Sequence, residues 1–348
     1  MRRWTFLLLA LSCSAEGADR PAELPESAGL AAAPERSRAA TDSVAIEEWV
    51  VPWEDTRPRD PAVDSGRDRI WFVGQVGDYL AWLDPASGSF ERIDLSPGAG
   101  PHNVVVAPDG IVWYAGNGTA HIGRVDPATG GIEQVPMPDP GGRDPHTLAV
   151  GPEGEIWFTV QTGNSVGRLD RATREVRLIP VPTRAARPYG IVVDGDGRPW
   201  FTEFGSHKLG TIDPATMELR EYELPRTEAR PRRVVITSDN GVWYVDYAEG
   251  YVGRLDPATG AVREWRAPGG EESLPYAMAV DDGDRIWFVE TGPEPNRLVG
   301  FDPAGEEFVW SQPVPSGGGS VRHMVYDPAE RAIWFGTDAG TIGRARLP

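Results

Sequence analysis

Three histidines, two tyrosines and an arginine recur at one fixed place in this sequence, eleven residues before a tryptophan. They are His102, His146, Tyr189, Arg232, Tyr276 and His323. A second set lies three residues after each tryptophan and comprises Gly74, Gly116, Val160, Glu203, Asp246, Glu290 and Thr337. A neutral imidazole can accept a proton near pH 7, and carboxylates are common metal ligands. These residue types indicate acid–base chemistry or ligand binding, provided that the fold brings the two sets together.

The tryptophans that mark these positions recur every 42 to 47 residues. They are Trp71, Trp113, Trp157, Trp200, Trp243, Trp287 and Trp334. A period in the forties is typical of β-propellers, in which each repeat forms one blade. Seven repeats therefore predict an all-β, seven-bladed propeller. The tryptophans themselves are expected to pack between neighbouring sheets, because a large aromatic side chain buries much area there.

Each repeat contains four short runs that are typical of antiparallel strands. Segments such as Ala107-Pro-Asp-Gly110 and Asp126-Pro-Ala-Thr-Gly130 favour tight turns between the runs. In the second repeat the expected strands are 102–107, 111–115, 121–125 and 132–138.

The last repeat lacks a fourth strand, since the sequence after Thr341–Arg346 is too short for one. The segment Ala45–Pro52, which precedes the first repeat, resembles the fourth strand of the other repeats. We therefore predict that this N-terminal strand completes the last blade and closes the ring, which removes two open sheet edges.

The same repeat pattern places the two sets of chemical residues near each other. Residues symmetric about a hairpin turn pair across the strands, so His102 is expected opposite Gly116 and Tyr189 opposite Glu203. Both sets would then face one mouth of the central channel, where converging polar groups are a default site. The alternative is a solvated pore rim with scattered polar residues.

Composition and the N-terminal segment indicate what the protein can bind and where it is located. The net charge of −18 argues against nucleic-acid binding, and the sole cysteine, Cys13, excludes internal disulfides. Residues 1–13 have a basic start and a short apolar core, which predicts a signal peptide with a lipoprotein-type box at Cys13; a plain secretory signal cut near Ala15 is the alternative. Residues 14–43 predict a disordered tether, and 44–348 the propeller. We expect an exported protein, periplasmic or extracellular, that touches a membrane only through a lipid anchor.

The repeats resemble those of the virginiamycin B lyase (streptogramin lyase) family. The likeness rests on Trp200-Phe-Thr-Glu203, on Gly253–Gly260 and on the blade closures, and covers roughly residues 44 to 348. It implies a monomeric seven-bladed propeller that opens cyclic streptogramin B antibiotics by elimination at an ester, and so an antibiotic-resistance activity. It also implies a histidine as acid or base, and Mg²⁺ held by another histidine and a glutamate.

Transfer of the family's site residues is partial. His323 fills the position of the catalytic histidine, whereas Tyr276 and Thr337 stand where the metal ligands would be. A site rotated around the ring would use His146 and Glu203 as Mg²⁺ ligands and Tyr189 in place of the catalytic histidine. The candidate catalytic residues are His323, Tyr189 and Tyr276; the candidate substrate contacts are His102, Arg232, Asp246 and Glu290; and the candidate metal ligands are His146 and Glu203.

Three functions fit this pattern. The first is a metal-assisted carbon–oxygen lyase, or a hydrolase, acting on a cyclic ester or lactone. The second is a non-catalytic propeller that binds a small molecule, peptide, glycan or partner at the same mouth. The third is a lactonase-type propeller that holds Ca²⁺ through carboxylate and Asn ligands, which the absence of Asn from both sets disfavours.

Overall fold

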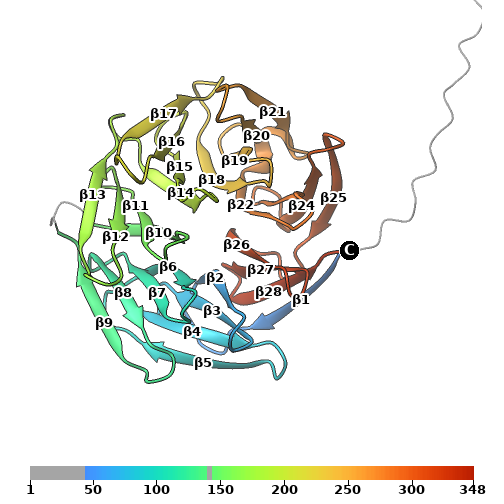
Figure 1. Cartoon of the computed structure of the whole chain (residues 1–348). Helices are drawn as coiled ribbons and strands as arrows, with labels where there is room; N and C mark the ends of the chain where they lie inside the picture. The colour runs from blue at the N-terminus through green and yellow to red at the C-terminus, as the bar shows by residue number, and fades with distance from the viewer. Residues whose placement is uncertain (1–43, 139–142) are drawn as a thin grey trace, which may run out of the picture. The chain divides into compact units, whose positions relative to one another are not determined.

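The computed structural model describes residues 44–138 and 143–348, which form seven four-stranded antiparallel sheets arranged in a ring (Figure 1). The predicted seven-bladed all-β propeller is confirmed. The predicted signal peptide (1–13) and tether (14–43) lie outside the described residues. Within the described part, no helix is long and apolar enough to cross a membrane.

Each blade has the same strand order from the axis outward. The inner strands are β2 (Pro58–Asp64), β6 (Pro101–Val106), β10 (Pro145–Val150), β14 (Pro188–Val193), β18 (Pro231–Ile236), β22 (Pro275–Val280) and β26 (Val321–Asp327). The second strands are β3 (Arg69–Gly74), β7 (Val112–Gly116), β11 (Ile156–Val160), β15 (Pro199–Glu203), β19 (Val242–Asp246), β23 (Ile286–Glu290) and β27 (Ala332–Thr337).

The outer half of each blade completes the sheet. The third strands are β4 (Tyr79–Asp84), β8 (His121–Val125), β12 (Ser165–Leu169), β16 (Lys208–Ile212), β20 (Tyr251–Leu255), β24 (Arg297–Asp302) and β28 (Thr341–Arg346). The outermost strands are β5 (Ser89–Asp94), β9 (Ile132–Pro136), β13 (Val176–Pro180), β17 (Leu219–Glu223), β21 (Val262–Arg266), β25 (Glu307–Pro313) and β1 (Ala45–Val50). One 3-10 turn, η1 (Gly270–Ser273), precedes β22.

The core lies between the blades, where the repeated tryptophans are buried with 0–3% of their surface exposed. Trp334 of blade 7, for example, packs in one cluster with Ile70 and Phe72 of blade 1. Several tryptophans also stack on an aromatic residue of the outermost strand, as Trp243 does on Trp265 at 5.3 Å. The expected role of the tryptophans is therefore confirmed: each fixes the contact between one sheet and the next.

The N-terminal strand closes the ring, as predicted. Strand β1 pairs antiparallel with β28, with Ala45 opposite Arg346 and Val50 opposite Thr341. Trp49 stacks on Trp334 at 5.5 Å, and the Arg344 guanidinium lies 5.1 Å from both rings. Blade 7 is thus built from both ends of the propeller sequence, and its aromatic stack reproduces those of blades 4 to 6.

Removal of this stack tests the closure in solution. We expect Trp49→Ala to lower the free energy of unfolding by about 2 kcal/mol, because a half-buried aromatic contact and a cation–π contact are lost. Trp265→Ala, which removes the matching stack in blade 5, is the control and should cost a similar amount. Urea unfolding followed by tryptophan fluorescence measures both. If Trp49→Ala were as stable as the unsubstituted protein while Trp265→Ala was not, β1 would not close the ring.

Candidate functional site at the propeller axis

The inner strands carry a β-bulge close to their start, and this bulge sets the register of the site. In blade 2, Pro101 pairs with Gly116 and Val104 with Tyr114, so His102 and Asn103 together face a single residue. Each of the other inner strands shows a similar shift near its first residues. The expected pairing of His102 with Gly116 is therefore displaced by one residue, because a bulge adds an unpaired residue to one strand.

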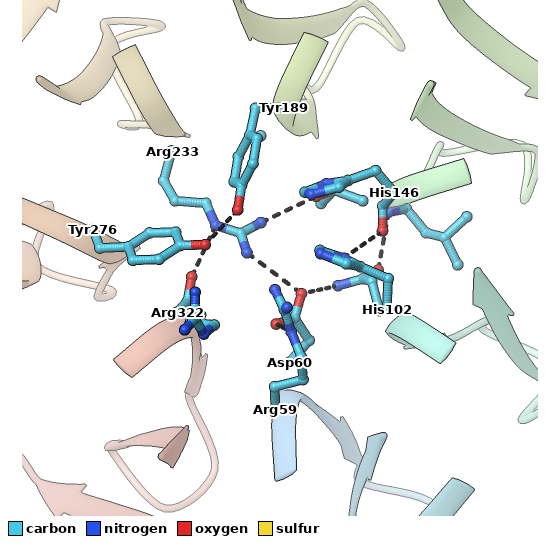
Figure 2. A network of polar contacts seen from close by, with 12 residues as sticks. Arg59, Asp60, His102, His146, Tyr189, Arg233, Tyr276 and Arg322 are labelled. Atoms are coloured by element: carbon cyan, nitrogen blue, oxygen red, sulfur yellow. Dashed lines mark hydrogen bonds and ion pairs between the residues drawn. The ribbon is translucent and has the colours of Figure 1, made fainter. Parts of the chain in front are cut away.

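Two rings of side chains surround the axis. The second residue of every inner strand forms what we call the entry ring: Arg59, His102, His146, Tyr189, Arg232, Tyr276 and Arg322. The third residue of every inner strand forms what we call the inner ring: Asp60, Asn103, Thr147, Gly190, Arg233, Ala277 and His323. Figure 2 shows members of both rings converging from different blades.

His323 therefore lies in the inner ring and not beside His102, as the count from the tryptophan had suggested. The first hairpins of blades 1 and 7 contain one extra residue, since Val63 pairs with Ile70 and Tyr326 with Ile333. Counting eleven residues back from the tryptophan therefore stops one position short of the entry ring in these two blades. The count from the tryptophans did not identify Arg59, Asp60, Arg233 and Arg322 as residues at the axis. Counting forward from the proline that opens most inner strands would have found Arg59.

The entry ring is a packed chain of aromatic and imidazole groups. The His102 and His146 rings are 3.6 Å apart, and His146 lies 4.2 Å from the Tyr189 ring. His102 Nδ1 is 3.0 Å from the backbone oxygen of His146. The Tyr189 and Tyr276 hydroxyls are hydrogen-bonded to each other across the axis (Figure 2). These four side chains are 1–5% exposed, so the ring closes this end of the channel with its own side chains.

Arg232 is enclosed by aromatic rings on the same side of the propeller. Its guanidinium carbon lies 3.7 Å from the Tyr276 ring, 4.2 Å from Tyr247, 4.5 Å from Phe204 and 5.0 Å from Tyr189. A guanidinium over several aromatic faces is held by their quadrupoles. Phe204, Tyr247 and Arg232 are only half-buried. Solvent therefore reaches the entry ring at Arg232, between Phe204 and Tyr247.

A buried ion-pair network spans the axis at the level of the inner ring. Asp60, which is fully buried, bonds Arg59 Nε at 3.0 Å, Asn103 Nδ2 at 3.0 Å and Arg233 Nη2 at 3.4 Å. Arg233 comes from blade 5 and also donates to the Arg322 carbonyl of blade 7 at 3.0 Å and to Thr147 at 3.2 Å. Burial would raise the pKa of Asp60, but Arg59 and Arg233 hold it well below its ordinary value.

The pKa values of Tyr276 and Tyr189 shift in opposite directions in these surroundings. Burial would raise the pKa of Tyr276, but the charges of Arg232, Arg59 and Arg233, together with the hydrogen bond from Tyr189, bring it below its ordinary value. Burial raises the pKa of Tyr189, and the charge on Tyr276 adds to the effect. Two neighbouring groups whose environments separate their pKa values are suited to act as a base and its hydrogen-bonding partner.

The axial imidazoles stay neutral. Burial lowers the pKa of His102 and of His146 well below the ordinary value, and nearby positive charges lower both further. Burial lowers the pKa of His323 to about 3, with Arg233 contributing in the same direction. Neutral histidines can accept or donate hydrogen bonds, but here they add no positive charge to the arginines.

The three carboxylates of the second set turn toward local loops. Glu203 accepts a hydrogen bond from Ser206 Oγ at 2.7 Å, and its Oε1 is buried without a partner. Asp246 accepts the backbone N–H of Arg230 at 2.8 Å and pairs with Arg226 at 3.3 Å.

Glu290 completes the set: it accepts the backbone N–H of Gly269 at 2.6 Å and pairs with Arg297 at 3.0 Å. Burial raises the pKa of Glu203 to about 8. These hydrogen bonds and ion pairs join the three carboxylates to loops and outer strands rather than to side chains of the entry ring.

Comparison with known proteins settles the family. The sequence model of the virginiamycin B lyase family matches residues 35–294. The chain belongs to the virginiamycin B lyase family. The matched region ends before β24, so strands β26, β27 and β28 of blade 7, with Arg322 and His323, lie outside it. A search of curated proteins found no match.

Solved structures support the fold. Selenomethionine-substituted virginiamycin B lyase from Staphylococcus aureus has a TM-score of 0.80 at 23% identity, over 88% of this chain and 100% of that chain. A streptogramin B lyase structure gives 0.79 at 24% identity, over 88% of this chain and 98% of that one. A catalytically inactive histidine-to-alanine variant of the S. aureus enzyme, with quinupristin, gives 0.80 at 23% identity, over 88% and 100% of the two chains. At these identities the likeness shows the fold alone.

The donor set does not fit the Mg²⁺ ion that this family implies. His146 Nδ1 lies 2.9 Å from Thr147 Oγ1, and its ring is packed against His102 and Tyr189. Glu203 Oε2 accepts the hydrogen bond of Ser206 Oγ in the turn between β15 and β16. The nearest charges to His146 include Arg233 and Arg59, which repel a cation. Across residues 44–138 and 143–348, no three His, Cys, Asp or Glu side chains are grouped to hold a metal.

Loss of the Asp60 carboxylate tests the axial network. We expect Asp60→Asn to lower the free energy of unfolding by about 3–5 kcal/mol, because two buried guanidinium groups lose their shared counter-charge. Asp64→Asn, at the far end of the same strand, is the control; Asp64 pairs with the less buried Arg67, so about 1 kcal/mol is expected.

The pH dependence of this difference follows from the lowered pKa of Asp60. The stability that the Asp60 carboxylate contributes is fully present above its unfolded-state pKa of about 4. It is lost as the pH falls toward the lower pKa of the folded state. The gap between Asp60→Asn and the unsubstituted protein should therefore be constant from pH 7 to 5 and shrink below pH 4. Urea unfolding at each pH measures it, and equal costs for the two substitutions would contradict the network.

Proposed function

We propose that this protein is a carbon–oxygen lyase that opens an ester bond in a cyclic substrate, such as a streptogramin B, by elimination at the entry ring. Membership of the virginiamycin B lyase family supports the reaction class. The observation that carries the proposal is the Tyr276–Tyr189 pair set among Arg232, Arg59 and Arg233.

In the proposed reaction, the Tyr276 phenolate removes a proton from the carbon next to a carbonyl group of the substrate. The electrons of that C–H bond form a carbon–carbon double bond, the C–O bond of the ester breaks, and the ester leaves as a carboxylate. The product is a ring-opened isomer. Tyr189 donates a hydrogen bond to the Tyr276 oxygen and stabilises its phenolate form.

Arginines supply the positive charge for this chemistry. Arg232 and Arg322 are half-buried members of the entry ring, and both lie near the Tyr276 ring, at 3.7 and 5.8 Å. Fixed cations aimed at developing negative charge are a strong source of transition-state stabilisation. Because Tyr276 is only 1% exposed, side chains of the entry ring must move before a substrate can reach its hydroxyl. His323 has no role at this end, since it belongs to the inner ring.

A second candidate is binding without turnover. The close packing of His102, His146, Tyr189 and Tyr276 favours it, because a fully buried ring offers a substrate little room. The cationic groups would then select an anionic small molecule or peptide at the half-exposed face of Arg232.

Mass spectrometry after incubation with a streptogramin B tests the reaction. We expect a ring-opened product of unchanged mass, formed equally well in EDTA. Tyr276→Phe should lower kcat by about 10²-fold or more, since general-base catalysis contributes that much. Tyr222→Phe, on β17 at the rim, is the control and should keep full activity. A product heavier by water, or loss of activity in EDTA, would contradict this mechanism; binding without product would support the second candidate.

The pH profile tests the base separately. Because the pKa of Tyr276 lies below the ordinary tyrosine value of about 10, kcat/KM should rise with pH along a limb centred below 10. The limb reflects loss of the Tyr276 proton, so it should be absent from the residual activity of Tyr276→Phe. A rising limb that is unchanged in that variant would assign the base to another group.

We also propose that the protein is exported as a monomer and held at a membrane by a lipid on Cys13. The basic and apolar start of the sequence supports export, and the residues before Cys13 support lipidation. In a bacterial host, Cys13→Ser should abolish incorporation of labelled palmitate and release the protein from the membrane fraction. Unchanged fractionation would favour a plain secretory signal.

A further inference from the structure

A cavity lies on the side of the inner ring that faces away from the entry ring. Its volume is about 390 Å³, and the inner strands of blades 3 to 7 line it. Apolar side chains make up most of the wall, among them Ile191, Val193, Val235, Met278 and Val325. A concave, largely apolar space of this size is typical of small-molecule sites.

One end of the cavity is polar. Arg233 and His323 are the charged and imidazole groups in its lining. His323 Nδ1 is buried and has no hydrogen-bond partner. The Arg233 guanidinium donates hydrogen bonds to the Arg322 carbonyl, to Thr147 and to Asp60. N–H groups on Nη1 and Nη2 remain for another acceptor. A buried polar atom without a partner is uncommon and marks a place where a ligand can add a bond.

The charge at this end favours an anion. Arg59 and Arg233 share a single carboxylate, Asp60, so the buried network carries one excess positive charge. His323 is neutral and adds none. The entry ring contains no carboxylate, and the Tyr276 hydroxyl carries a negative charge only in its phenolate form. One ligand carboxylate would balance the network.

We propose that this cavity binds a monocarboxylate with a slender apolar tail, with the carboxylate between His323 Nδ1 and Arg233 and the tail along Ile191, Val193 and Val235. In this arrangement His323 donates its Nδ1–H to the ligand, and Arg233 provides a charge-assisted hydrogen bond. The site is separate from the entry ring, since the Asp60–Arg233 network lies between the two.

Calorimetric titration with octanoate tests the site. Octanoate should bind the unsubstituted protein, and 1-octanol, which has a similar tail and no charge, should bind at least tenfold more weakly. His323→Leu should weaken octanoate binding tenfold or more, because leucine fills similar space but cannot donate the hydrogen bond. His207→Leu, in the loop before β16, is the matched control and should bind octanoate like the unsubstituted protein. Val193→Trp should abolish binding by filling the cavity.

Proton and nitrogen NMR of labelled histidine gives a second measurement that does not depend on a variant. Octanoate should shift the His323 resonances alone among the axial histidines and raise the pKa of that imidazole. Lack of octanoate binding at millimolar concentration, equal affinity for octanol, or an unaffected His323→Leu variant would each overturn the site. Tyr276→Phe should bind octanoate normally, so failure of the lyase mechanism and failure of this site give different results.

Discussion

Burial of one tryptophan per blade against the next sheet sets the geometry on which the axial site depends. These side chains are almost fully buried, and they fix the distance and angle between neighbouring sheets. Once seven sheets are spaced in this way, the first residues of seven inner strands must meet around one axis. The chemistry at the axis is then decided by which side chain follows the start of each inner strand.

In this chain those side chains make a cationic axis. Four arginines lie in the two rings, whereas the only carboxylate in the rings is Asp60. Two consequences follow from the same charges: the histidines remain neutral and Tyr276 becomes more acidic. A propeller of this family can thus keep its fold while the axis favours anions over metal cations.

The repeat pattern predicted the blade number, the strand order and the closure by β1, because hydrophobic period and turn residues are local properties of each repeat. It predicted the residues of the entry ring only in blades 2 to 6. The first hairpins of blades 1 and 7 contain one extra residue. Arg59 and Arg322 therefore lie in the entry ring, although the count from the tryptophan does not reach them. The bulges were also invisible to the pattern, since they depend on backbone conformation, as at Asp60 with its φ of 50°.

Pairwise contacts across the axis could not be predicted either. The Asp60–Arg233 ion pair joins residues 173 positions apart, and no repeat places an acid and a base there by rule. Likewise, no pattern in the sequence predicts that Glu203, Asp246 and Glu290 bond to neighbouring loops. Their direction depends on a serine hydroxyl, backbone N–H groups and arginines in segments that vary between blades.

Closure by β1 also fixes an order of events during synthesis. Glu48 of β1 bonds to Thr341 of β28 across 293 positions of sequence. Blades 1 to 6 are continuous in sequence and can form as the chain emerges, whereas blade 7 needs one of the first strands and the last one. Until β28 has been made, β1 has no strand with which to pair, and the axial bond from Arg233 to the Arg322 carbonyl has to wait for β26 of the same blade. The axial site is therefore completed only when β26, the last inner strand, has joined the ring.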